Sequence, residues 1–248
     1  MNTIGILWLR QIKRFYRSKA RLLGTIAMPL LFLLAFGFGF GPVFAEAGQG
    51  NYLQFLVPGI ICMSILFSSV MSGIEIIWDR QFGFLKETLV APVSRLEIMI
   101  GRTLGGATVA FAQGVLILLI SMLFGFYIIS WTLVPVALLF MILIALFFAA
   151  LGTAIASLLN DMQGFQLIMN FLIMPIFFLS GALFPLDTTP VAIQWISKIN
   201  PLTYGVAGVR SSLLGTAQAS ILGNLILLSV LTIIILVIGS KLFSKMQI

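Results

Sequence analysis

Long apolar stretches alternate with short polar connections along the whole chain. Six stretches are long enough to cross a bilayer as helices, because about 20 residues rising about 1.5 Å each cover a hydrocarbon core of about 30 Å. We therefore predict an all-α membrane protein with six transmembrane helices, forming a single domain over residues 1–248. The predicted spans are about 22–42, 54–76, 103–127, 134–158, 164–184 and 221–241.

The basic residues gather on alternate connections between these spans. All of the 14 Lys and Arg residues except Lys198 and Arg210 lie within 10–21, 80–102 and 241–245. Because basic loops are retained in the cytoplasm, both termini and the loop after the second span are predicted to be cytoplasmic, in a cytoplasmic (inner) membrane. The first apolar run is longer than that of a secretory signal, so we interpret it as a permanent helix.

Composition narrows the function classes. The chain is 60% hydrophobic and 8% charged, whereas a soluble domain is about 25% charged. The net charge of +7 is explained by loops facing anionic lipid, so we expect membrane lipid and no nucleic acid as a partner. The sequence has no His, a single Cys and no GxSxG or HExxH pattern, and we expect no catalytic, cofactor or metal site in it.

Residues 3–21 have the pattern of an amphipathic helix. In projection at 100° per residue, Arg10, Lys13, Arg14, Arg17 and Arg21 share one face, and Ile4, Trp8, Ile12 and Phe15 share the other. Such a helix is expected to lie in the membrane interface; a frayed polybasic tail is the alternative. Gly101 and Gly105 stand four apart at the start of the third span, where small residues allow helices to approach closely.

Two connections are too apolar to be simple loops. Residues 78–102 mix charges with Phe82, Phe84 and Leu85, which indicates a docking surface or burial in the lipid interface. Residues 185–214 contain two short apolar segments separated by Asn200-Pro201. Each is too short to cross the membrane, so we predict an extracellular re-entrant hairpin before the last span. Arg210 within it either pairs with a carbonyl, acid or headgroup or extends to the surface.

Three motifs resemble the ABC-2 family of transporter permeases. The segment Asp79-Arg80-x-x-Gly83-x-Leu85-Lys86-Glu87-x-Leu89-x-x-Pro92-x-Ser94-Arg95 resembles the loop after that family's second helix. Phe178-Leu179-Ser180-Gly181-x-x-Phe184-Pro185-Leu186 is similar to the end of its fifth helix. Asn200-Pro201-Leu202-Thr203-Tyr204, followed by Arg210, is similar to its extracellular hairpin.

The resemblance implies the permease subunit of an ATP-binding cassette exporter. Its expected partners are two copies of an ABC ATPase subunit, which would bind ATP and Mg, and a second permease copy or close homologue. Residues 82–92 would be the coupling helix, and the implied ATPase-coupling residues are Asp79, Arg80, Phe82, Gly83, Phe84, Leu85, Lys86, Glu87, Pro92 and Arg95. The implied hairpin residues are Trp195, Asn200, Pro201, Tyr204 and Arg210.

The resemblance also places the pathway between two permeases, along helices 1, 2 and 5. Candidate lining residues there, chosen as aromatic or small polar groups, are Phe36, Phe40, Ser64, Ser68, Asn170 and Phe177. For each of them, packing between helices is an equally open interpretation. Abundant Phe and Met, with 22 and 11 residues, suit a hydrophobic or amphipathic substrate, although helices that face lipid have the same composition.

The source of energy can be argued from the residues alone. No GxxxxGK[ST] sequence occurs, so the chain has no P-loop and needs either a partner ATPase or an ion gradient. Gradient-driven carriers usually hold titratable groups near the membrane midplane. The only acid in a predicted span is Glu75, near the cytoplasmic end, where we expect it to reach the interface. An ATPase-powered subunit is therefore favoured over an ATP-independent secondary carrier or channel, and over an intramembrane enzyme or assembly factor.

Overall fold

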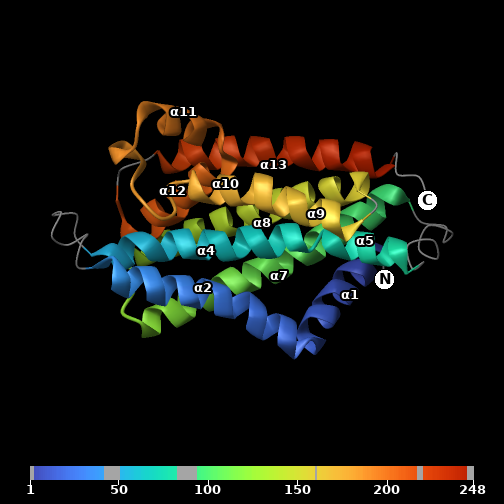
Figure 1. Cartoon of the computed structure of the whole chain (residues 1–248), viewed down its shortest axis with the longest axis horizontal. Coiled ribbons are helices and arrows are strands. Elements are labelled where there is room, and N and C mark those ends of the chain that lie inside the picture. The colour runs from blue at the N-terminus through green and yellow to red at the C-terminus, as the bar shows by residue number, and fades with distance from the viewer. Residues whose placement is uncertain (1–2, 42–50, 83–93, 160, 217–219, 245–248) are drawn as a thin grey trace.

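The computed structural model describes residues 3–41, 51–82, 94–159, 161–216 and 220–244, and within 20–22 it describes only the backbone. All regular structure in these residues is helical (Figure 1). The long helices run lengthwise, and the start of α1 and the end of α13 lie at the same end of the bundle. An even number of lengthwise passes through the bundle produces this arrangement.

Among the described residues, four helical stretches are long and apolar enough to cross a membrane. They are α4 (Tyr52–Met71) with α5 (Ile74–Gln81), α7 (Arg95–Leu123), α8 (Val134–Leu158) with the short η1 (Trp131–Leu133), and α13 (Ile221–Ser244). Two shorter apolar helices, Leu23–Gly39 and Met162–Phe178, correspond to the first and fifth predicted spans.

The core lies around α4 and α8. α8 packs against α4, α7, α12 (Pro201–Leu214) and α13, and most side chains of α4 are buried. By contrast, α13 buries only Leu228, Thr232, Gly239 and Phe243 among its residues, although it is strongly apolar. Since exposed apolar area of this extent is unfavourable in water, lipid must cover the outside of the bundle.

The N-terminal part differs from the prediction in its boundaries. The helix predicted for 3–21 ends at Arg17, and after Ser18 a new helix, α2 (Lys19–Gly39), begins in a different direction (Figure 1). α1 (Thr3–Arg17) packs along α7. A Cβ added at Gly101 would lie 2.9 Å from Leu7 Cβ, and one at Gly105 would lie 2.6 Å from Gln11 Cβ. The two glycines therefore allow the close helix approach that their spacing predicted.

The second predicted span is not one uninterrupted helix. α4 ends at Met71, a turn follows at Ser72–Gly73, and α5 extends beyond the predicted end to Gln81. The turn lies directly against α8, because a Cβ at Gly73 would come within 2.3 Å of the Gly152 carbonyl oxygen. Hydropathy alone does not reveal this break, since the residues around it remain apolar.

The fifth predicted span, 164–184, is also irregular. It consists of α9 (Met162–Ile168), the π-helical turn η2 (Met169–Ile173) and α10 (Met174–Phe178), and it ends before the predicted boundary. Pro175 lacks an N–H and cannot bond to the carbonyl four residues earlier, which favours a widened turn at this point. The chain then reverses at Gly181, whose φ of 74° suits glycine.

The predicted hairpin is helical and broken where expected. It contains η3 (Leu186–Thr188), α11 (Val191–Ile199) and α12 (Pro201–Leu214), at the end of the bundle opposite the chain termini (Figure 1). Asn200 Oδ1 accepts a hydrogen bond from Leu202 N at 3.0 Å, and Pro201 occupies the first helical position. Asn-Pro thus ends one helix and caps the next.

Candidate functional site

A cavity of about 570 Å³ lies between α2, α4–α5 and α10, with Gln113 of α7 also reaching it. Its wall is mainly apolar and is formed largely by Met and Phe side chains with Pro29. This size and composition are typical of small-molecule sites. Its principal apolar lining residues are Met28, Pro29, Phe32, Met63, Phe67, Met71, Met174 and Phe177.

The structure brings together half of the lining residues predicted from the sequence. Ser64, Ser68 and Phe177 line the cavity. Phe36 and Phe40 lie beyond it, and Asn170 is exposed on the π-helical turn, outside the lining. The cavity residues Thr25 and Gln113 were not predicted; Gln113 Nε2 donates to Thr25 Oγ1 at 2.6 Å.

A row of aromatic rings continues from the cavity towards the hairpin end. Phe32 stacks on Phe36 with ring centroids 5.3 Å apart, and Phe36 stacks on Phe40 at 5.5 Å. Tyr52 follows at 6.4 Å from Phe40, and Phe55 lies 6.3 Å from Tyr52. Phe36 and Phe40 are therefore part of one aromatic surface that extends the cavity wall along α2 to α4.

The aromatic row ends at Arg210, whose guanidinium carbon lies 3.8 Å from the Phe55 ring centroid. Arg210 Nη2 donates to the carbonyl oxygens of Phe55 at 3.1 Å and Gly181 at 3.0 Å. Of the two possibilities left open by the sequence, pairing with carbonyls is the one realised. Arg210 thereby joins α12 to α4 and to the turn after α10.

The other hairpin residues have mainly local contacts. Asn200 Nδ2 donates to the Ile176 carbonyl at 2.6 Å, and the Tyr204 hydroxyl donates to the Lys198 carbonyl. Trp195 is 63% exposed, with Lys198 Nζ 4.3 Å from its ring centroid. α11 therefore keeps an apolar outer surface that the described protein does not cover.

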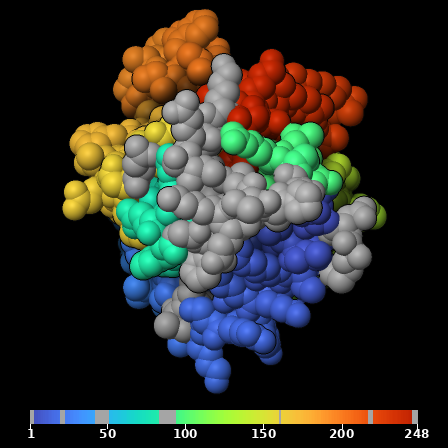
Figure 2. All heavy atoms as spheres, turned by 90° about the vertical axis from the view of Figure 1, so that its right-hand side faces the viewer, coloured from blue at the N-terminus to red at the C-terminus, as the bar shows by residue number. Residues whose placement is uncertain are grey.

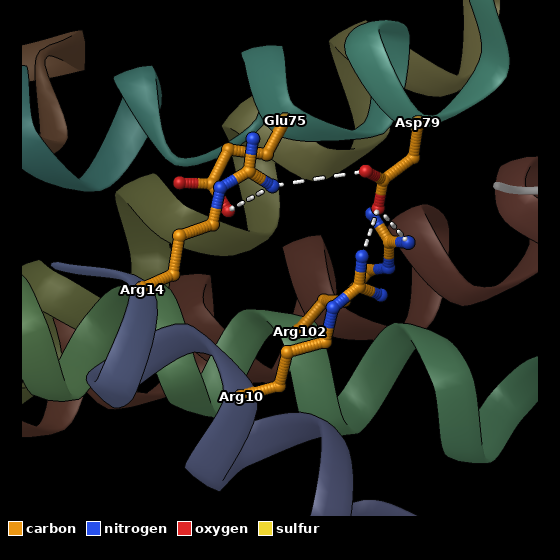
Figure 3. Close-up of polar contacts among 5 residues, drawn as sticks. All are labelled: Arg10, Arg14, Glu75, Asp79 and Arg102. Carbon is orange, nitrogen blue, oxygen red and sulfur yellow. Dashed lines mark hydrogen bonds and ion pairs between the residues drawn. The ribbon is translucent and has the colours of Figure 1, made fainter. Parts of the chain in front are cut away.

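A buried charge cluster lies at the opposite end, beside the cavity (Figure 3). Asp79 Oδ2 accepts a 2.6 Å hydrogen bond from Arg102 Nη2 and lies 3.5 Å from Arg10 Nη2. Arg14 Nη1 is 3.7 Å from both Glu75 Oε2 and Asp79 Oδ1. Glu75, Asp79 and Arg102 are each no more than 4% exposed, so these charges depend on one another for compensation.

The cluster joins three helices. Arg10 and Arg14 come from α1, Glu75 and Asp79 from α5, and Arg102 from α7 (Figure 3). Figure 2 views this end of the molecule, where α1 in blue, α5 in teal and the start of α7 in green are all visible. The Arg14 guanidinium carbon also lies 5.6 Å from the Trp78 ring centroid. A displacement of α5 would therefore be transmitted to α1.

Two sequence-based expectations need correction here. Glu75 does not reach the interface but is buried and paired with Arg14. The basic face of α1 is not directed wholly at headgroups, because Arg10 and Arg14 turn towards α5. Its apolar face packs in part on α7, where Trp8 Nε1 donates to Thr108 Oγ1 at 3.0 Å. The cause in both cases is an oppositely charged partner on a neighbouring helix, which a helical projection cannot show.

The implied ATPase-coupling residues fall into two groups. Gly83, Phe84, Leu85, Lys86, Glu87 and Pro92 lie outside the described residues. Phe82, directly after α5, is 72% exposed. Arg80 donates to the Leu159 carbonyl at 3.4 Å, and Arg95 donates to the Ser244 carbonyl at 2.7 Å. Asp79 is buried in the charge cluster, so its carboxylate lies away from the exposed surface.

Sequence reasoning missed Arg102 as a functional candidate. It counted among the basic loop residues, yet α7 begins at Arg95, where the N-cap Ser94 forms a capping box with Glu97. Arg102 thus lies two turns inside α7, between buried Gly101 and Thr103. An arginine within an apolar helix requires an acidic or carbonyl partner, and this was the available signal. Within the described residues, no group of His, Cys, Asp and Glu could hold a metal ion.

Comparison with known proteins agrees with this geometry. A sequence model of the ABC-2 type transporter family matches residues 2–214. The chain is 32% identical to the putative transport permease ycf38 of Cyanophora paradoxa, over 85% of this chain and 73% of that protein. It is 30% identical to the inner membrane transport permease YadH of Escherichia coli K12, over 84% and 82% of the two chains.

A third relative is Nodulation protein J of Rhizobium leguminosarum bv. viciae, which is 28% identical over 88% of this chain and 86% of that protein. Permeases of this family normally work with a separate ABC ATPase and are not themselves catalytic. The family match, the matching relatives and the bundle of apolar helices show that this chain is a multi-pass membrane protein belonging to the ABC-2 type transporter permease family.

Proposed function

We propose that this chain is the membrane-spanning subunit of an ATP-driven exporter that moves a hydrophobic or amphipathic substrate out across the inner membrane. The observation that carries the proposal is the position of the apolar cavity next to the charge cluster that joins α1, α5 and α7. Arg14 belongs to the cluster and also lines the cavity, as does Trp78, whose ring lies beside the Arg14 guanidinium. A substrate site and a mechanical connection to the cytoplasmic end thus lie side by side.

In this proposal six segments cross the membrane, with both termini in the cytoplasm. α2 and the irregular α9–α10 segment supply the first and fifth crossings. They are shorter than the four long spans, but residues of both line the cavity. A membrane locally thinned or deformed around them accommodates short apolar helices at modest cost.

The ATPase acts through residues 82–92 as the coupling helix. α5 leads directly into this segment, and Asp79 anchors α5 to α1 and α7. Asp79 is therefore a supporting residue rather than a direct docking contact. Closure of the two ATPases would move α5 and α1 together and change the cavity that both border, which is alternating access.

The working unit is two permeases, as a homodimer or a pair with a close homologue. The surface made by α2 and α10 bears exposed apolar residues beside the cavity, among them Leu31, Phe38 and Phe178. A second copy placed against this surface would enclose the pathway and the aromatic row. Residues 1–248 act as a single domain in this arrangement.

The test is reconstitution of the full chain with its ATPase in inside-out vesicles. We expect ATP-dependent uptake of an amphipathic dye, loss of uptake with an ATPase unable to hydrolyse ATP, and two permeases per particle by native mass spectrometry. Uptake that needs an ion gradient but no ATP would replace this proposal with the secondary carrier. A particle that exports with one permease would overturn the paired pathway.

A further inference from the structure

Two hollows meet at the junction of α1 and α2. One is the apolar cavity, and the other is a groove of about 920 Å³ along α1. Arg14 and Ser18 line both of them, so the basic groove adjoins the mouth of the apolar cavity. Among the residues that the structure describes, no Asp or Glu lines either hollow. The groove is lined by Ile6, Leu9, Arg10, Lys13, Arg14, Arg17 and Ser18.

Arg14 is the cation of the cluster best placed to meet a ligand. In the cluster, the guanidinium groups of Arg10, Arg14 and Arg102 lie against the carboxylates of Glu75 and Asp79 (Figure 3), and that of Arg14 also lies 5.6 Å from the Trp78 ring centroid. Arg102 is held at 2.6 Å and is buried, whereas both ion pairs of Arg14 are 3.7 Å long and its side chain is 35% exposed. A turn of the Arg14 side chain towards the groove therefore breaks only weak contacts.

The interior of the cavity offers hydrogen-bonding groups as well. Ser64 Oγ and Gln113 Oε1 are buried and have no hydrogen-bond partner in the described part of the chain. Both residues line the cavity and are at most 3% exposed. Buried polar atoms are normally satisfied by protein, water or ligand. A hydroxyl or amide N–H on a bound molecule is a suitable donor for either atom.

We propose that the substrate is an anionic amphiphile that enters from the inner leaflet at the α1–α2 junction. Its negative head lies in the groove among Lys13, Arg14 and Arg17, and its apolar chain extends into the cavity between α2 and α10. A hydrogen-bond donor on the apolar chain of the substrate bonds to Ser64 Oγ or Gln113 Oε1. This inference deepens the proposed function and rests on it for the direction of transport.

Binding is tested on the full-length chain in nanodiscs of zwitterionic lipid, without ATP. The probe is 11-(dansylamino)undecanoic acid, and its methyl ester is the uncharged control with the same chain. We expect the acid to bind saturably and about tenfold more tightly than the ester. Equal affinity of the two probes would overturn the anionic preference.

Charge-removing variants locate the head. Lys13 and Arg17 line the groove, whereas Lys19 is exposed but lines neither hollow. A basic residue near a membrane surface changes anion binding by about fivefold. Lys13→Gln and Arg17→Gln should each weaken binding of the acid by about this factor and leave the ester unchanged, and Lys19→Gln should leave both unchanged. If all three variants weaken binding of the acid equally, the acid is attracted to the basic surface in general and does not bind in the groove.

A variant that fills the cavity tests whether the apolar chain of the substrate binds there. A Cβ at Gly24, which lines the cavity, meets no atom within 4 Å. Gly24→Leu should therefore fold and reduce binding of the acid and the ester at least tenfold. Gly5→Leu is the matched control, since Gly5 is also helical and open but lies outside the cavity. Unchanged binding in Gly24→Leu would show that the apolar chain of the substrate does not bind in the cavity.

A transport measurement separates this inference from the proposed function. With the ATPase present, the acid should be exported and should compete with the amphipathic dye, and Arg17→Gln should raise the concentration for half-maximal export. If the dye is exported but the acid is bound without being transported, the acid site holds a resident lipid and the substrate assignment fails alone. If binding follows the predicted pattern and nothing is exported with ATP, the proposed function fails and the substrate assignment falls with it.

Discussion

Arg102 Nη2 lies 2.6 Å from Asp79 Oδ2, and both side chains are almost completely buried. This contact joins α7, a long apolar helix, to α5, the helix that leads into the segment resembling a coupling helix. Arg10 and Arg14 of α1 extend it to a third helix. The cluster thereby joins α1, α5 and α7 beside the cavity.

Asp79→Asn should destabilise the protein strongly. Removing one member of a buried ion pair leaves the other charge uncompensated, at a cost of about 3–5 kcal/mol. Thermal unfolding of the purified chain in detergent should show a clear fall in Tm. Asp187→Asn, at an exposed acid in the hairpin region, is the matched control and should leave Tm unchanged.

The double variant Asp79→Leu with Arg102→Met tests the reason for that loss. Replacing both partners by apolar residues removes the uncompensated charge, so the double variant should be more stable than Asp79→Asn alone. If the loss of stability in the double variant equals the sum of the losses in Asp79→Leu and Arg102→Met alone, the ion pair does not hold α5 to α7.

Gly152→Ala should disturb the junction of α4, α5 and α8. The added Cβ would lie 2.6 Å from the Val70 carbonyl oxygen, and backbone at that distance has to move. Overpacking of this kind costs about 1–3 kcal/mol. Gly39→Ala, where nothing lies within 4 Å, should be neutral or slightly stabilising in the same unfolding measurement.

Arg210→Met should loosen the hairpin from the bundle. The carbonyl oxygens of Phe55 and Gly181 lose their charged donor, and charged hydrogen bonds contribute about 1.5–3 kcal/mol. Limited proteolysis should then cut near α11 and α12 faster than in the parent chain. Lys198→Met removes a cation that lies over an exposed ring and should have little effect. Equal cleavage rates in the two variants would show that Arg210 does not anchor the hairpin.

Thiol labelling tests whether the hairpin dips into the membrane. Ile199 is 84% exposed within the protein, so only lipid can shield a cysteine placed there. In a Cys62→Ala background, Ile199→Cys should react slowly with an impermeant reagent added outside, and Asp187→Cys should react rapidly. Rapid labelling at both positions would mean that α11 is solvated and that no re-entrant hairpin exists.

Variants in residues 82–92 test how the ATPase is coupled to export. Phe84→Ala and Glu87→Arg should abolish ATP-driven export while leaving membrane insertion and Tm intact, since apolar anchors and rim charges determine docking. Loss of co-purification with the ATPase would identify docking as the failed step. Normal export by both variants would place the docking surface elsewhere.

Much of the fold could be predicted because apolar length and loop charge are local properties. The four long helices and the break at Asn200-Pro201 depend on residues near one another in sequence. The interruption at Ser72–Gly73 and the π-helical turn before Pro175 were missed. Both occur within runs of apolar residues, where hydropathy gives no boundary.

The candidate site was only partly predictable for the same reason. Ser64, Ser68 and Phe177 could be proposed as cavity residues from their types and places in the spans, yet Asn170, chosen in the same way, lies outside. Which side of a helix faces a cavity depends on how neighbouring helices pack around it.

By itself, the sequence determined that lipid surrounds this protein, that its family is that of ABC-2 permeases, and that it has no P-loop. Only the tertiary structure decided that Arg102, Arg10 and Arg14 surround Asp79, and that a basic groove adjoins an apolar cavity at Arg14. Those relationships join residues on α1, α5 and α7, and their free energy arises when packing brings buried charges within a few ångströms of one another.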